Sequence, residues 1–169
     1  LGLPPDADAD AARAAFLARG AQEASAAITS RGGVCVPVLP EDPAEDAALR
    51  ARPLVTTRRL GEAPPHPLPS PTASAPLSGI RVLDLTRVIA GPVATRTLAL
   101  LGADVLRIDP PGLPEIGWQH LETGHGKRSA LLDLADPADR MRFDALLADA
   151  DVIALGYRRA GLDQLGLSA

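Results

Sequence analysis

The chain has 169 residues, a formal net charge of −4 and a hydrophobic content of 46%. This length allows one domain or two small ones, and the apolar fraction is enough for a packed core, which excludes a disordered chain. Interspersed acidic and basic residues, with an aromatic content of only 2%, argue against nucleic acid or an anionic membrane surface as a partner.

The start of the sequence does not resemble a leader, and no stretch predicts a membrane span. No apolar run reaches the roughly eighteen residues that a span requires, and the N-terminus is acidic where a secretory signal is basic. We therefore expect a cytoplasmic protein. The single cysteine, Cys35, excludes a disulfide framework and a cysteine-based zinc site within the chain, and its apolar neighbours predict a buried position.

The first segment, residues 1–61, is expected to form a small αβα unit. An alanine-rich helix, a β-branched strand and a second helix are predicted over residues 6–30, 34–39 and 43–52. Pro37 lacks a backbone N–H and so favours an edge position for the strand. Asp42 is a candidate N-cap for the second helix.

Residues 62–76 form the clearest boundary in the sequence. Six prolines fall between positions 63 and 76, with serine and threonine among them and no apolar period. This composition predicts an extended, semi-rigid linker. It separates the first segment from a second segment over residues 77–169.

The segment over residues 77–169 alternates between predicted strands and helices. A helix is expected to begin near Pro92 and to end at Gly102, a residue that tolerates positive φ. Strands are expected over residues 80–85, 105–108, 130–134 and 151–155, with a further helix over 137–149. Short apolar strands joined by helices are typical of α/β proteins, so we expect a Rossmann-like parallel sheet with flanking helices. No further strand completes this sheet, and we expect the segment to be the truncated beginning of a larger domain.

The loop over residues 86–92 is the first candidate ligand site. Right-handed crossover geometry places it at the carboxyl end of the first strand, beside a helix N-terminus whose free N–H groups attract anions. Arg87 adds a fixed positive charge to this loop, and Tyr157 and Arg158 follow the last strand at the same edge. These features fit a phosphorylated ligand, with capping of the sheet as the structural alternative for Tyr157 and Arg158.

Other charged residues of this segment are candidates for binding or for support. Lys127 and Arg128, which follow a glycine, predict a cationic loop near the carboxyl ends of the strands, with an ordinary solvated turn as the alternative. Asp84 lies between two leucines of the first strand, which predicts a buried carboxylate. Such a group needs a partner, either the N–H groups of the following loop or an arginine.

Common nucleotide, metal and hydrolase motifs are absent from the sequence. The glycine spacing fits neither a Walker A loop nor a G-x-G-x-x-G dinucleotide loop. The three histidines show no H-E-x-x-H pairing, and His66 lies in the proline-rich stretch, so no metal site is expected. A serine hydrolase of the α/β type is not expected because the G-x-S-x-G elbow is missing.

Three stretches of residues 77–169 carry a family resemblance. They read LSGIRVLDLTRVIAGPVATRTLALLGADVLRIDPPG, GKRSALLDL and ADVIALGYRRAGLDQLGL. In this order and spacing they resemble the N-terminal part of the class III CoA-transferases, a family that includes formyl-CoA transferase, carnitine CoA-transferase and α-methylacyl-CoA racemase. The resemblance implies a Rossmann-like large domain, a small domain and an interlocked dimer, with CoA or acyl-CoA as substrate and without a metal.

The resemblance also implies a reaction. In the transferases of this family, an aspartate attacks an acyl-CoA thioester and holds CoA as an aspartyl-CoA thioester until an acceptor carboxylic acid takes it. The racemases use a histidine and an aspartate as acid and base at the α-carbon. The nucleophilic aspartate is expected beyond this chain, so no catalytic residue is assigned and the fragment by itself is expected to be inactive.

A CoA site follows from the same resemblance. Val88 and Ala90 match loop residues that lie along CoA, and Tyr157 matches an aromatic position beside the adenine. The family's glutamine, arginine, asparagine and arginine are replaced here by Ile89, Pro110, Gly156 and Gln164. Phosphate contacts are then expected from Arg87, Lys127, Arg158 or Arg159. The predicted CoA-binding residues are Arg87, Val88, Ile89, Ala90, Lys127, Arg128, Tyr157 and Arg158.

The first segment also shows a family similarity. Its sequences RGGVCVPV and PEDPAEDAALRARPLV are similar to a small-domain stretch that follows the large-domain strands in the family, whereas here they precede those strands. This order predicts a tandem or fused protein, so either an interlocked homodimer or a fused pseudo-dimer is expected. The sequence is interpreted as a fragment of a CoA-transferase. The alternatives are an acyl-CoA racemase of the same family and a non-catalytic CoA-binding or structural half of a fused dimer.

Overall fold

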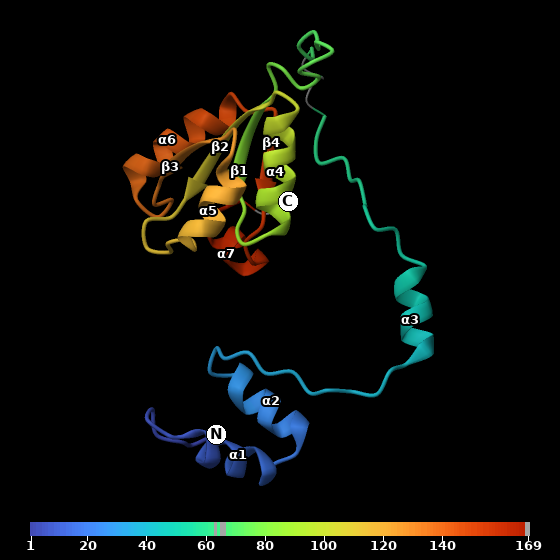
Figure 1. Ribbon diagram of the computed structural model, residues 1–169, viewed down its shortest axis with the longest axis vertical. Helices are drawn as coiled ribbons and strands as arrows, with labels where there is room; N and C mark the ends of the chain where they lie inside the picture. Colours follow the sequence, from blue (N-terminus) through green and yellow to red (C-terminus); the bar gives the residue numbers. More distant parts are fainter. Residues whose placement is uncertain (63, 65–66, 168–169) are drawn as a thin grey trace. The chain divides into compact units, whose positions relative to one another are not determined.

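The computed structural model describes residues 1–62, 64 and 67–167. Two compact units, Leu1–Arg59 and Leu60–Ala169, make up the chain (Figure 1). Part of the predicted linker, including His66, and the last two residues lie outside the described residues. The division into residues 1–61, 62–76 and 77–169 stays a prediction.

Three helices form in the described residues of the first unit. They are α1 (Ala9–Leu17), α2 (Ala21–Thr29) and α3 (Pro43–Arg50). The predicted cap of α3 is confirmed, because the Asp42 carboxylate accepts hydrogen bonds from two N–H groups of the first turn. The prediction of one helix over residues 6–30 is wrong. Gly20 separates α1 from α2 in an extended conformation, with φ −68° and ψ 149°, as expected for a residue of low helix propensity.

The strand predicted over residues 34–39 does not form, so the αβα prediction is wrong for this unit. Val34 and Val38 are 81% and 99% exposed, and no strand occurs elsewhere among the described residues of the unit. A lone β-branched run cannot pair its backbone groups, and a hydrogen bond from the Ser25 hydroxyl to the Cys35 carbonyl oxygen ties it to α2 instead. Cys35 is half-buried and not in a core, contrary to expectation.

The second unit contains a four-stranded parallel sheet in the order β3-β2-β1-β4. Its strands are β1 (Arg81–Leu85), β2 (Asp104–Asp109), β3 (Arg128–Leu131) and β4 (Val152–Leu155). The predicted α/β class and parallel sheet are confirmed. The third strand begins two residues earlier than predicted, which changes the position of Lys127 and Arg128.

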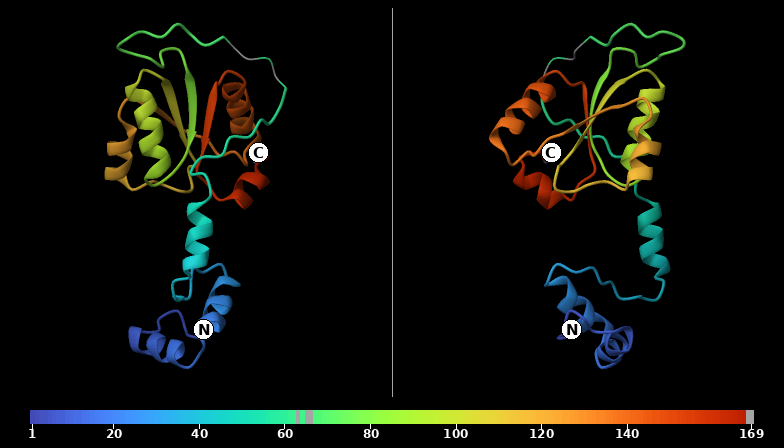
Figure 2. Two further views of the ribbon diagram at one scale, coloured as in Figure 1. Left: turned by 90° about the vertical axis from the view of Figure 1, so that its right-hand side faces the viewer. Right: turned by 60° about the vertical axis from the view of Figure 1, so that its left-hand side comes forward.

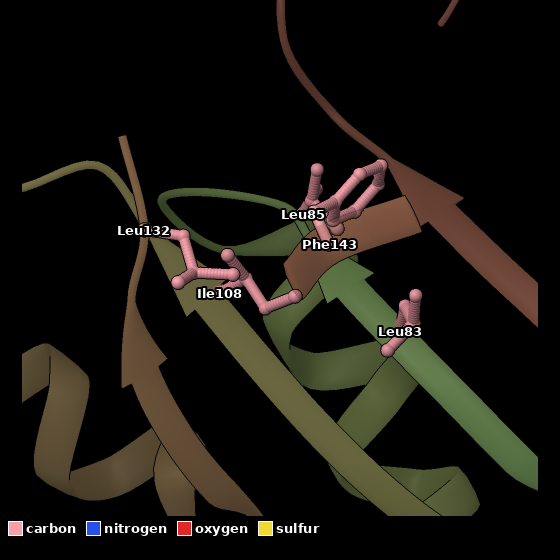
Figure 3. Packing of buried hydrophobic residues seen from close by; sticks show 5 residues of the cluster. All are labelled: Leu83, Leu85, Ile108, Leu132 and Phe143. Atoms are coloured by element: carbon pink, nitrogen blue, oxygen red, sulfur yellow. The ribbon is translucent and has the colours of Figure 1, made fainter. Parts of the chain in front are cut away.

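Helices cover both faces of this sheet. They are α4 (Ala90–Leu100), α5 (Gly117–Gly124), α6 (Pro137–Ala148) and α7 (Arg159–Gln164). Figure 2 shows α4 and α5 on one face and α6 on the other. Val82 and Val105 pack against the α4 side, while Leu83 and Leu85 pack with Phe143 of α6 on the opposite side (Figure 3).

Alternation along the strands explains why both faces are buried, since successive side chains point to opposite sides. Helix α4 agrees with the prediction, and Gly102 follows it with φ +98°. None of the described helices is long and apolar enough to cross a membrane.

Candidate functional site

The order in which strands are added to the sheet reverses between β1 and β4. The chain moves outward from β1 to β2 and β3, and then returns to place β4 on the other side of β1. In open parallel sheets, ligands bind outside the carboxyl ends of the strands at such a switch point. Here that edge carries the loop after β1 and the residues after β2 and β4.

An apolar cavity of about 270 Å³ lies at this edge. The strand ends supply Leu85 and Ile108, the segment after β3 supplies Leu132, and Tyr157 and Leu162 close the cavity from the region after β4. The Tyr157 hydroxyl is buried and has no hydrogen-bond partner among the described residues. Burial, reinforced by the nearby negative charge of Asp109, raises the pKa of the Tyr157 hydroxyl above its usual range.

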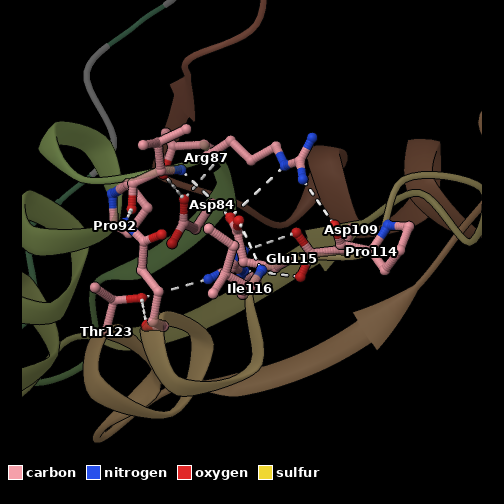
Figure 4. A network of polar contacts seen from close by, with 12 residues as sticks. Asp84, Arg87, Pro92, Asp109, Pro114, Glu115, Ile116 and Thr123 are labelled. Atoms are coloured by element: carbon pink, nitrogen blue, oxygen red, sulfur yellow. Dashed lines mark hydrogen bonds and ion pairs between the residues drawn. The ribbon is translucent and has the colours of Figure 1, made fainter. Parts of the chain in front are cut away.

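The loop after β1 has a left-handed residue at its centre. Val88 adopts φ +69°, which is rare for a β-branched side chain. Val88 and Ile89 expose 55% and 62% of their surface, respectively. The Arg87 side chain contacts the segment before α5 (Figure 4). Its Nη2 donates to the Pro114 carbonyl oxygen at 2.7 Å, and its Nε lies 3.7 Å from Glu115 Oε2.

A buried ion network supports this loop from the neighbouring strand. The Arg107 side chain is 1% exposed, and its Nε and Nη2 donate to the two Asp109 carboxylate oxygens at 2.7 and 3.0 Å. Its Nη2 also donates to Glu115 Oε2 at 3.1 Å. Burial would raise the pKa of Glu115, but N–H donors from Ile116 and Val88, together with Arg107 and Arg87, hold it below its usual range. Glu115 is therefore ionised at neutral pH.

A second buried ion pair joins β1 to α4 and to the residue before β3. The Lys127 Nζ lies 2.8 Å from Asp84 Oδ2 and also donates to the Pro92 carbonyl oxygen and the Thr95 hydroxyl. Burial alone would raise the Asp84 pKa, but hydrogen bonds from Lys127, Thr86 and Thr95 lower it overall. The predicted partner of Asp84 is thus confirmed in the N–H of Thr86, whereas its cationic partner is a lysine and not an arginine.

The structure separates the predicted binding residues into two groups. Arg87, Val88, Ile89, Ala90, Tyr157 and Arg158 follow β1 or β4 and share the carboxyl edge of the sheet. Lys127 and Arg128 do not form a loop at the carboxyl ends, contrary to expectation, because β3 begins at Arg128. The Lys127 side chain nevertheless extends to Asp84, the next-to-last residue of β1. The Lys127 ammonium is enclosed by Asp84, and Arg128 pairs with Asp104, the first residue of β2.

Three residues of this edge were not predicted: Arg107, Glu115 and Gln119. Arg107 and Asp109 had a detectable signal, since opposite charges two residues apart share one face of a strand. Glu115 lies before α5 and Gln119 lies within it, and the sequence analysis did not predict this helix. Neither residue belongs to a sequence motif. No group of three histidine, cysteine, aspartate or glutamate residues that could hold a metal ion occurs among the residues described.

Curated proteins of similar sequence are CoA-transferases. The chain is 38% identical over 103 residues to acetyl-coenzyme A transferase nodX of Hypoxylon pulicicidum, covering 61% of this chain and 17% of that protein. It is 38% identical over 104 residues to the acetyl-CoA:oxalate CoA-transferase of Acetobacter aceti, covering 55% of this chain and 27% of that protein.

The fold has a solved counterpart at similar identity. The crystal structure of a hypothetical protein (Rv3272) from Mycobacterium tuberculosis matches with a TM-score of 0.51 and 33% identity, covering 59% of this chain and 30% of that one. The chain thus spans less than a third of the length of these relatives. Residues 77–169, more than half of the chain, match the CoA-transferase family III. This protein belongs to the CoA-transferase family III.

Proposed function

We propose that this chain supplies part of the CoA site of an enzyme that transfers CoA between carboxylic acids. The observation that carries the proposal is the apolar cavity at the carboxyl edge of the sheet, which is closed by Tyr157 and shares this edge with the exposed loop after β1. Relatives named as acetyl-CoA:oxalate and succinate–glutarate CoA-transferases support this reaction class. The Tyr157 ring would lie beside the adenine.

The loop after β1 would contact the parts of CoA other than the adenine. Val88, Ile89 and Ala90 are exposed there, and the α4 N-terminus that follows offers N–H groups to an anionic or carbonyl oxygen. Arg87, Arg158 and Arg159 are the basic side chains of this edge that remain in the proposal. Lys127 leaves it because its ammonium already has three buried acceptors.

The proposed chemistry is covalent transfer through an aspartyl-CoA thioester. A carboxylate attacks the acyl-CoA carbonyl, the thiolate of CoA leaves and then attacks the resulting anhydride at the aspartyl carbonyl, and the first acid departs as its carboxylate. The acceptor acid reverses these steps. Asp84 and Asp109 are committed to Lys127 and Arg107, respectively. By resemblance to the family, the nucleophilic aspartate of this proposal comes from another part of the protein.

The test uses the full-length gene product in D₂O with a panel of acyl-CoAs and free carboxylic acids, and mass spectrometry of the products. CoA on a new acid without α-deuterium is the expected result and excludes the racemase. Incorporation of α-deuterium without exchange of the acid would overturn the proposal in favour of the racemase. CoA binding without either product would favour the non-catalytic half of a fused dimer.

Two attributes of the whole protein belong to the same proposal. An interlocked homodimer or a fused pseudo-dimer is expected, and light scattering of the full-length protein distinguishes them by mass. Cell fractionation tests the proposed cytoplasmic location.

A further inference from the structure

The conformation of Val88 is not maintained by its own side chain. Its φ of +69° is unfavourable for a β-branched residue, and 55% of its surface is exposed, so packing does not hold it. The loop is also tight, because a Cβ placed on Gly91 would come within 2.3 Å of the Thr86 side chain. Strain of this kind persists only where surrounding contacts fix it.

Both backbone groups of Val88 are bound by side chains from a different part of the chain. Its N–H donates to Glu115 Oε2 at 3.3 Å, and its carbonyl oxygen accepts from Gln119 Nε2 at 2.6 Å. Gln119 is 6% exposed, and so is the Glu115 side chain. The hydrogen bond from Gln119 is partly buried, whereas the one to Glu115 is exposed, so the Gln119 contact is better shielded from solvent and is the stronger support.

The Glu115 side chain and the backbone that carries Gln119 are themselves fixed. Glu115 accepts from Arg107 Nη2 and from the N–H of Ile116, and Arg107 is held by Asp109 at the end of β2. Gln119 lies in α5, one turn before Thr123. The Thr123 hydroxyl donates to the backbone carbonyl oxygen of Gln119. A rigid connection therefore runs from β2 and α5 to the centre of the loop after β1.

We propose that Gln119 and Glu115 are positioning residues that hold Val88 in its left-handed conformation and thereby set the orientation of the loop toward CoA. This inference rests on the proposed function. If Val88 relaxed to negative φ, the peptide between Val88 and Ile89 would rotate, and its carbonyl oxygen would leave the Gln119 amide that now binds it. Neither side chain needs to touch the substrate.

The test measures CoA affinity of the full-length protein by calorimetry for Q119M, made both in the wild-type and in a V88G background. Glycine adopts positive φ without strain, so the loop then no longer needs to be held. We expect Q119M to weaken CoA binding by about tenfold in the wild-type background and by less than about threefold in the V88G background. Q22M, the same change at an exposed position of α2, is the matched control and should leave the affinity unchanged.

Hydrogen exchange gives a readout that does not depend on activity. Faster exchange of the amides of residues 88–90 is expected in Q119M and not in Q22M. If Q119M does not fold, E115Q in the same two backgrounds supplies the same comparison.

An equal loss of CoA affinity in both backgrounds would show a structural effect unrelated to Val88 and would overturn the inference, as would an unchanged affinity in Q119M. Failure of the wild-type protein to bind CoA would instead contradict the proposed function, so the two failures are distinguishable.

Discussion

Lys127 and Arg128 are adjacent basic residues in opposite surroundings. The Lys127 side chain is 1% exposed and pairs with Asp84, which is 0% exposed, whereas the Arg128 side chain is 69% exposed in its pair with Asp104. Removing one partner of a buried pair leaves an uncompensated charge, while a solvated pair contributes little. We expect K127M to lower the free energy of unfolding by about 3–5 kcal/mol.

R128M is the matched control and should cost less than about 1 kcal/mol. Urea titration followed by circular dichroism measures both values. Equal effects of the two changes would show that the buried pair with Asp84 does not stabilise the fold.

At the scale of the element, α6 depends on its first turn. Asp136 accepts hydrogen bonds from the N–H groups of Ala138 and Asp139 at 2.9 and 3.0 Å, and the helix carries Phe143, which is 0% exposed, into the core. Without the Asp136 carboxylate, the N–H groups of Ala138 and Asp139 can bind only water. D136A should therefore lower the free energy of unfolding by about 0.5–2 kcal/mol.

The conservative variant D136N keeps a side-chain oxygen at the cap and should retain most of the stability. Thermal unfolding of both variants beside the wild type provides the measurement. A melting temperature equally low in D136N and D136A would assign the effect to the negative charge of Asp136 and not to capping.

The elements that the sequence predicted correctly are those in which local pattern and long-range pairing agree. The runs around Val82 and Val105 are β-branched and also find parallel partners, so both became strands. The equally β-branched run around Val36 has no partner strand in its unit and stays extended and exposed. Strand propensity describes a fit to a sheet that another segment must provide.

The site was predicted only as far as topology determines it. The order of strands and helices was enough to place Arg87 and Tyr157 at one edge. It was not enough for Lys127, because an error of two residues in the start of β3 moves a side chain from a solvent-exposed loop to a buried contact. Glu115 and Gln119 support the loop through tertiary contacts to Val88, from which they are 27 and 31 residues distant in the sequence. No local sequence pattern encodes such contacts.

At the scale of the whole molecule, the buried carboxylates make stability depend on pH. The pKa values of Asp84 and Glu115 lie below their ordinary values of 3.8 and 4.5 in the folded chain. A group with a lowered pKa binds fewer protons when folded than when unfolded, so it stabilises the fold above its ordinary pKa. That contribution is lost as the pH falls through the folded-state pKa. Acid unfolding should therefore begin below about pH 4.5.

Glu115 provides the sharper form of this prediction. E115Q cannot lose a proton at this position, so it should be less stable than the wild type by roughly 1–3 kcal/mol at pH 7, where the wild-type carboxylate is ionised and bound to Arg107. As the pH falls toward 3, the wild-type carboxylate takes up a proton and the difference should narrow. E122Q removes an exposed carboxylate of the adjacent helix α5, and its difference from the wild type should stay within about 0.5 kcal/mol throughout. Urea titrations of the three proteins between pH 7 and pH 3 measure these differences, and a gap for E115Q that did not change with pH would mean that ionisation of Glu115 does not support the fold.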